Sequence, residues 1–126
     1  PPPVESSSPE HPANDARYRF IDRKDLPATE CLKDVVARVL PYWNESIVPQ
    51  LKSDMNVLVT AHGNSLRALV MYLEGISEAD IAELNIPTGV PRRYTFNASM
   101  NVVAVNYLGD ADAIAAAAAA VANQSK

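Results

Sequence analysis

Hydrophobic residues recur at intervals of three and four along residues 32–40 and again along residues 66–73. This spacing gathers apolar side chains on one face of an α-helix, so the pattern predicts a helix in each segment. Gly75 follows the second segment and is well placed to end that helix. A shorter helix is predicted to start at Ser77, as its N-cap, and to run to Leu84.

The first predicted helix carries signals at both ends. Thr29 is a suitable N-cap, and Glu30 lies in the first turn, where a carboxylate is favourable. Pro41 has no amide hydrogen and should kink the helix or restart it. Apolar residues continue beyond Pro41 to residue 51, and we expect Trp43 among them to pack in the core.

Residues 55–60 form a nearly continuous apolar run, which is typical of a parallel strand covered on both faces. Two further strands are predicted between residues 94 and 107, where the turn-forming residues 97–101 indicate a hairpin. A buried parallel strand needs neighbours in its sheet, and no second strand of that kind is found in the sequence. We therefore expect its sheet partners to be missing from this chain or to come from another polypeptide.

These elements predict an α/β fold in which helices flank a partial sheet, within one domain over residues 1–126. Residues 1–25 are rich in proline and serine, which predicts an irregular loop, and His11 is interpreted as a solvated residue of that loop. Residues 111–126 form an alanine-rich tail that should be helical if it docks on the rest, because an isolated helix would be marginal. The chain starts with proline, which suggests a fragment, a processed product or a truncated protein.

Composition and charge argue against several classes of function. The formal net charge of −4 and the lack of a basic run argue against a nucleic-acid surface. No apolar segment approaches the roughly 20 residues that a membrane-spanning helix needs. Cys31 is the only cysteine, so no disulfide can form within the chain, and we expect it to be a buried or half-buried packing residue. These features favour a reducing, cytoplasmic compartment.

The candidate functional residues follow the apolar run of residues 55–60 and begin at His62. Asn64 or Ser65 should cap the helix that follows, and the free amides of its first turn would point at a bound anion. An imidazole beside those amides can stabilise charge during phosphoryl transfer. The alternative is a structural histidine that binds a backbone carbonyl. Ser65 is a weak candidate for a hydrolase nucleophile, because the residues around it lack the second glycine of the G-x-S-x-G nucleophile elbow. Arg67 is interpreted as a paired helix residue rather than a substrate ligand.

Residues 61–67 (Ala-His-Gly-Asn-Ser-Leu-Arg) resemble the second-histidine motif of the cofactor-dependent phosphoglycerate mutases, a family within the histidine phosphatase superfamily. Other segments look like the same family, namely residues 32–34, 40–44, 73–77, 84–91, 107–110 and 120–124. The resemblance covers nearly the whole chain. It is specific to the mutases, because the superfamily at large shares little beyond the histidine.

This resemblance implies a glycolytic enzyme that interconverts 3-phosphoglycerate and 2-phosphoglycerate, which are small phosphorylated three-carbon acids. A phosphohistidine intermediate would be primed by 2,3-bisphosphoglycerate, without a metal. His62 would match the second histidine, which stabilises the transferring phosphoryl group, and Gly63 and Asn64 would match residues that contact the substrate. The complete protein is expected to be a homo-oligomer.

The chain also departs from the family pattern. The phosphorylated histidine of the family lies in an Arg-His-Gly motif that is absent here, since His11 stands between Glu10 and Pro12. The family's general acid/base glutamate and substrate-binding arginine pair precede a proline stretch like residues 1–3, and Arg92 and Arg93 do not match that pair. The resemblance therefore implies a carboxyl-terminal half, which lacks the amino-terminal strands of the sheet, needs the amino-terminal half as its partner and is inactive alone. Two alternatives are a phosphatase of the same superfamily and a non-catalytic phosphate-binding fragment.

Overall fold

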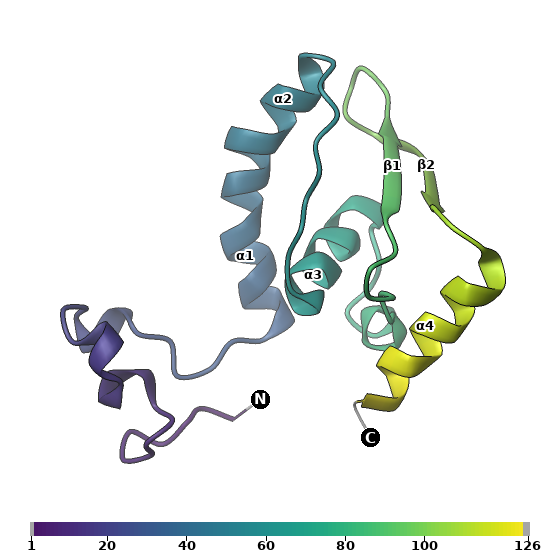
Figure 1. The fold of residues 1–126 in the computed structure, drawn as a ribbon. Coiled ribbons are helices and arrows are strands. Elements are labelled where there is room, and N and C mark those ends of the chain that lie inside the picture. The colour runs from purple at the N-terminus through teal and green to yellow at the C-terminus, as the bar shows by residue number, and fades with distance from the viewer. Residues whose placement is uncertain (1, 125–126) are drawn as a thin grey trace.

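Two helices that pack against each other form the centre of the fold. In the computed structural model, which describes residues 2–124, α1 (Leu32–Tyr42) contacts α3 (Gly63–Glu74) (Figure 1). Val35 of α1 is buried, as are three consecutive residues of α3, Ala68, Leu69 and Val70. Both helices were predicted from their apolar spacing, and both predictions are confirmed. Gly75 ends α3 with a positive φ of 63°, as its position predicted.

The α1 helix continues past Pro41 with a change of helix type. The α-helical hydrogen-bonding ends at Tyr42, a π-helical turn (Trp43–Ile47) follows, and α2 (Val48–Lys52) resumes the α-helix. Proline removes an amide donor, so a break in the regular pattern near this position is expected. Trp43 is only 6 % exposed and forms the core cluster with Ile47 and Leu69, so its predicted packing role is confirmed.

A two-stranded antiparallel hairpin completes the mixed α/β fold, which confirms the predicted fold class. β1 (Arg92–Phe96) pairs with β2 (Val102–Tyr107), and the register shifts between Thr95 and Phe96. Phe96 packs against the core cluster, with its ring centroid 6.0 Å from that of Trp43. The hairpin is thereby joined to the helices by an aromatic contact.

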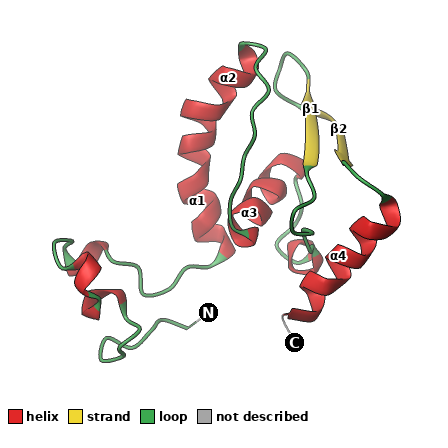
Figure 2. Cartoon of the chain, viewed as in Figure 1, coloured by secondary structure: helices red, strands yellow, loops and turns green. Residues whose placement is uncertain are grey.

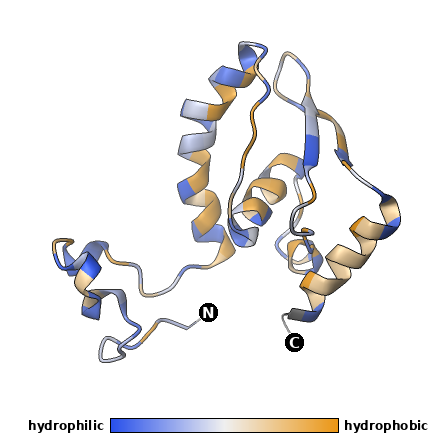
Figure 3. Cartoon of the chain, in the orientation of Figure 1, coloured by the Kyte–Doolittle hydropathy of each residue, from blue (hydrophilic) through white to orange (hydrophobic). Residues whose placement is uncertain are grey.

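The prediction of a strand at residues 55–60 is wrong for the chain as it stands. This segment is extended but belongs to no sheet, and Figure 2 shows it as a loop between α2 and α3. Within residues 2–124, no backbone hydrogen bond reaches residues 56–61. Val57 packs against the core cluster while Leu58 is 82 % exposed. Apolar residues (orange ribbon in Figure 3) therefore lie on an unpaired segment. A strand requires a partner, and no described segment lies in register to supply one.

Two local predictions about the start of α1 are also wrong. The N-cap is Cys31 rather than Thr29, because the Asp34 carboxylate accepts the Cys31 amide hydrogen at 2.8 Å. A capping box has two hydrogen bonds, and the bond from the N-cap amide to the side chain of the third helical residue, here Asp34, is one of them. Cys31 is exposed, not buried, because an N-cap lies outside the apolar stripe of its helix.

The two ends of the described chain form helices that lie outside the core cluster. Three short 3₁₀ helices, η1 (Pro12–Asn14), η2 (Ala16–Tyr18) and η3 (Arg23–Asp25), occupy the predicted irregular loop. The alanine-rich tail forms α4 (Ala111–Gln124), as predicted, with the last two residues of the chain outside the described part. A fourth 3₁₀ helix, η5 (Asp80–Glu83), lies after α3. Its N-cap is Ala79, so the prediction of Ser77 as the N-cap is wrong, although the Ser77 hydroxyl accepts the Asp80 amide at 3.1 Å.

A polar cluster joins the end of α3 to the hairpin. The Arg92 guanidinium donates to both carboxylate oxygens of Glu74 at 2.8 Å, and its Nε donates to the Tyr94 hydroxyl at 2.9 Å. The Tyr94 hydroxyl in turn donates to Glu74, and the Arg92 guanidinium carbon lies 4.8 Å from the centre of the Tyr107 ring. Burial and the bond to Glu74 raise the pKa of Tyr94 above its usual value. Burial opposes the charge of Arg92, but its bonds to Glu74 and Tyr94 raise the pKa of Arg92 overall.

We predict that Glu74→Gln lowers the free energy of unfolding by about 1–3 kcal/mol, because Arg92 would keep its charge in a largely buried place without its anion. Urea unfolding followed by circular dichroism measures this change. Glu78→Gln is the matched control, since it removes the same charge from an exposed side chain. Equal unfolding free energies for the two variants would contradict a stabilising role for the cluster.

Candidate functional site

The start of α3 presents a set of free backbone donors. His62 is the N-cap, with extended backbone angles (φ −63°, ψ 151°), and its carbonyl accepts the Leu66 amide at 3.0 Å. The amides of residues 63–65 have no hydrogen-bond partner within the described chain. Asn64 and Ser65 were predicted to be candidates for the cap, and that prediction is wrong because both lie inside the first turn. Free amides at a helix N-terminus, together with the helix dipole, favour an anion there.

His62 and Gly63 leave this helix end open. The imidazole of His62 is exposed and makes no capping hydrogen bond to α3. A Cβ atom added to Gly63 would meet nothing within 4 Å, so open space lies next to its amide. The backbone donors and the imidazole are therefore accessible to a ligand from solvent.

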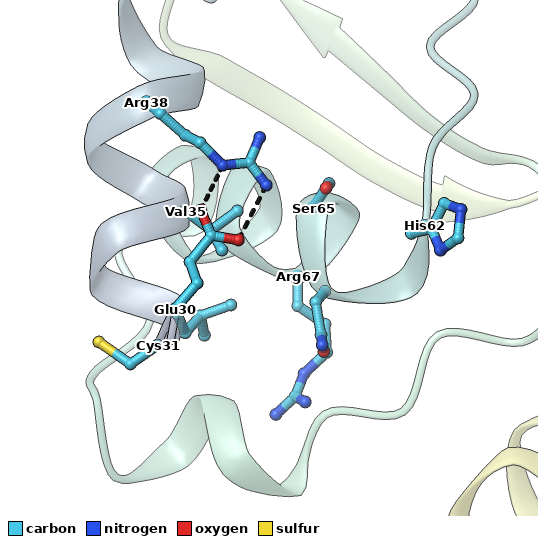
Figure 4. Close-up of a pocket in the computed structure, with 9 residues that line it drawn as sticks. Glu30, Cys31, Val35, Arg38, His62, Ser65 and Arg67 are labelled. Atoms are coloured by element: carbon cyan, nitrogen blue, oxygen red, sulfur yellow. Dashed lines mark hydrogen bonds and ion pairs between the residues drawn. The ribbon is translucent and has the colours of Figure 1, made fainter. Parts of the chain in front are cut away.

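An open pocket of about 580 Å³ lies between the first turns of α1 and α3 (Figure 4). It brings together His62 and Asn64 of the predicted site, while Gly63 is not among its lining residues. In Figure 4 the His62 ring points away from the side chains of α1, so it borders the pocket rather than filling it. The lining residues are Glu30, Cys31, Leu32, Val35, Arg38, His62, Asn64, Ser65 and Arg67.

The guanidinium of Arg67 donates hydrogen bonds to backbone carbonyls. Its Nη2 donates to the carbonyl of Ile81 at 2.5 Å and to that of Ala82 at 3.3 Å, which fixes α3 to η5. Its buried Nε has no hydrogen-bond partner within the described residues. The interpretation of Arg67 as a paired helix residue is confirmed.

Arg38 is a second cation of the pocket that sequence reasoning did not single out. It forms a two-pronged ion pair with Glu30, in which Nε and Nη2 donate to the two carboxylate oxygens. The hydrogen bond from Arg38 holds the pKa of Glu30 below its usual value, and Glu30 in turn raises the pKa of Arg38. The sequence does not indicate the Glu30–Arg38 pair, because Glu30 lies before α1 begins and the two residues are eight positions apart. Pairs within one helix are three or four positions apart.

The other histidine and the arginine pair of β1 have structural partners. His11 accepts the Ala13 amide at its Nδ1 at 3.0 Å and so caps η1, and it is not among the residues that line the pocket. Arg92 belongs to the Glu74 cluster, and Arg93 donates to the side chain of Asn106 at 3.3 Å.

No three or more His, Cys, Asp or Glu residues within residues 2–124 are arranged to hold a metal ion. No helix of this range is both long and apolar enough to cross a bilayer.

The unpaired amides at the start of α3 and the adjacent imidazole of His62 are groups that could bind a phosphate. The family model of the histidine phosphatase superfamily (branch 1) matches residues 4–106, and this chain therefore belongs to that superfamily. The match includes His62 and the pocket wall formed by α1. Membership indicates phosphoryl-transfer or phosphatase chemistry.

We predict that Arg67→Met lowers the free energy of unfolding by about 1–3 kcal/mol, because two carbonyls of η5 lose a charged donor. Arg38→Met is the matched control: its ion pair is solvent-exposed, so its loss should cost about 1 kcal/mol or less. Chemical denaturation of both variants and of the unchanged protein measures the difference. If Arg38→Met proved the more destabilising, the structural assignment of Arg67 would be wrong.

Proposed function

We propose that this chain is the carboxyl-terminal part of a cofactor-dependent phosphoglycerate mutase, a cytoplasmic, homo-oligomeric enzyme of glycolysis. Its reaction would interconvert 3-phosphoglycerate and 2-phosphoglycerate through a phosphohistidine. Superfamily membership supports the chemistry, and the resemblance of residues 61–67 and of six other segments to the mutases supports the substrate. The observation that carries the proposal is the position of His62 as N-cap of α3, beside three unpaired amides.

Phosphoryl transfer spreads charge over the equatorial oxygens of the moving group, so catalysis consists mainly of positioning and electrostatic stabilisation. The amides of residues 63–65 would hold a phosphate group of the substrate, with open space beside Gly63 for its approach. His62 would donate a hydrogen bond to the transferring phosphoryl group, and Asn64 would contact the substrate. The same donors suit a phosphate of 2,3-bisphosphoglycerate, which supplies the phosphoryl group that primes the enzyme.

The amino-terminal half would supply the remaining parts of the active site. None of the described histidines lies in an Arg-His-Gly motif, so the phosphorylated histidine would come from that half, together with the acid/base glutamate and the arginine pair. It would also supply strands for residues 55–60. The unpaired backbone of residues 56–61 and the exposure of Leu58 support such a partner, because unpaired strand edges bind further strands.

A phosphatase of the same superfamily is the alternative, because the match covers that chemistry equally. A substrate assay on the complete protein separates the two: a mutase transfers the phosphoryl group between positions of phosphoglycerate, and a phosphatase releases inorganic phosphate. A non-catalytic phosphate-binding fragment would bind phosphoglycerate without turnover.

In the complete enzyme, we predict that His62→Ala lowers the turnover rate on the order of 100- to 1,000-fold, the usual effect of removing one preorganised donor. Because His62 is exposed, the free energy of unfolding should change by about 0.5 kcal/mol or less. Turnover and denaturant unfolding are measured on the same preparation. His11→Ala is the control, since it removes a histidine outside the pocket and should leave turnover intact. Near-normal turnover in a destabilised His62→Ala variant would show a structural role.

Residues 1–126 alone should not interconvert the two phosphoglycerates, because covalent catalysis cannot proceed without the group that carries the phosphoryl. A coupled enzyme assay, on material whose intact mass corresponds to this chain, measures this. Turnover by the verified chain would refute the proposed division of the active site.

A further inference from the structure

Two arginines line the pocket, and only one of them is free to change partners. Arg67 donates to the backbone carbonyls of Ile81 and Ala82, and moving it would leave those carbonyls without their donor. Arg38 instead binds the side chain of Glu30, which can turn toward solvent. Among the described lining residues, Arg38 is therefore the displaceable cation.

The ion pair of Arg38 and Glu30 is easily broken. The two side chains are 56 % and 37 % exposed, so water screens their attraction and the pair adds little net stability. Water can also solvate Glu30 once it is released. Figure 4 shows the Arg38 guanidinium extending from α1 toward the first turn of α3, on the side of Ser65.

The partner that Arg38 already holds shows what chemistry it recognises. Its Nε and Nη2 donate to the two oxygens of one carboxylate, a planar match that arginine makes with carboxylates better than lysine does. Asn64 and Ser65, two of the three residues with unpaired amides, line the same pocket, and free amides at a helix N-terminus favour a phosphate. The pocket thus offers one place for a phosphate and one for a carboxylate.

We propose that Arg38 is a specificity-determining residue that binds the carboxylate of a phosphorylated acid, and that Glu30 occupies Arg38 until such a ligand displaces it. This inference rests on the proposed function, because it takes the phosphate to bind at the start of α3. It adds a reason for preferring phosphate esters that carry a carboxylate over those that do not.

Binding of two ligands to the full chain tests the proposal by isothermal titration calorimetry. One is 3-phosphoglycerate, and the other is glycerol 3-phosphate, which has the phosphate but no carboxylate. Arg38→Met should weaken binding of 3-phosphoglycerate about 10- to 100-fold, as expected for lost hydrogen bonds between charged groups, and should change glycerol 3-phosphate binding less than about twofold. Glu30→Gln should tighten 3-phosphoglycerate binding about two- to fivefold, because the competing carboxylate is gone.

Arg93→Met is the matched control, since it removes one positive charge from an exposed residue outside the pocket. It should leave the affinity for both ligands unchanged. Equal weakening of both ligands by Arg38→Met, or no weakening of either, overturns the carboxylate assignment and leaves the phosphate site standing. If the unchanged protein binds neither ligand, the phosphate site itself is refuted and this inference falls with it. Far-UV circular dichroism of each variant verifies that the helices are retained.

Discussion

The fixed position of α3 is the constraint on which the candidate site depends. Its packing against α1 is reinforced by Leu69 in the core cluster, by Arg67 on the carbonyls of η5, and by Glu74 on Arg92 of the hairpin. They lie in the middle and at the end of the helix, and no hydrogen bond within the described residues reaches the amides of its first three residues. The amides of residues 63–65 can therefore stay unpaired and accessible while the rest of the helix is rigidly placed.

Much of this arrangement could be predicted from local signals. The spacing of apolar residues 66–73 and the glycine after them define α3, and the turn residues 97–101 define the hairpin, because these signals act within a few residues. The failures involve partners distant in sequence or outside the described chain. Residues 55–60 have the composition of a buried strand, yet composition supplies no hydrogen-bonding neighbour. Arg38 was missed because its pairing depends on how the segment before α1 approaches the helix.

The capping errors have a similar cause. Thr29 has the right side chain for an N-cap, but Asp34 reaches back to the amide of Cys31 and sets the helix start two residues later. At α3, two good capping residues, Asn64 and Ser65, lie inside the helix, and His62 takes the cap position without a side-chain bond. A helix that starts two or three residues earlier than its capping residues predict, at a poorly capping histidine, leaves its first-turn donors without partners in the described chain. Such a departure from local preference is expected where a ligand supplies the missing partner.

The unpaired segment and the site are mechanically linked through His62. Residues 56–61 lead directly into the N-cap; Val57 packs against the core cluster, and no backbone hydrogen bond within the described residues holds the segment. Each backbone group in this stretch that gains a strand partner removes a degree of freedom from the residues before His62. Completion of the sheet would therefore do more than cover Leu58. It would fix the direction in which the imidazole leaves the backbone, and phosphoryl transfer depends on that kind of fixed donor.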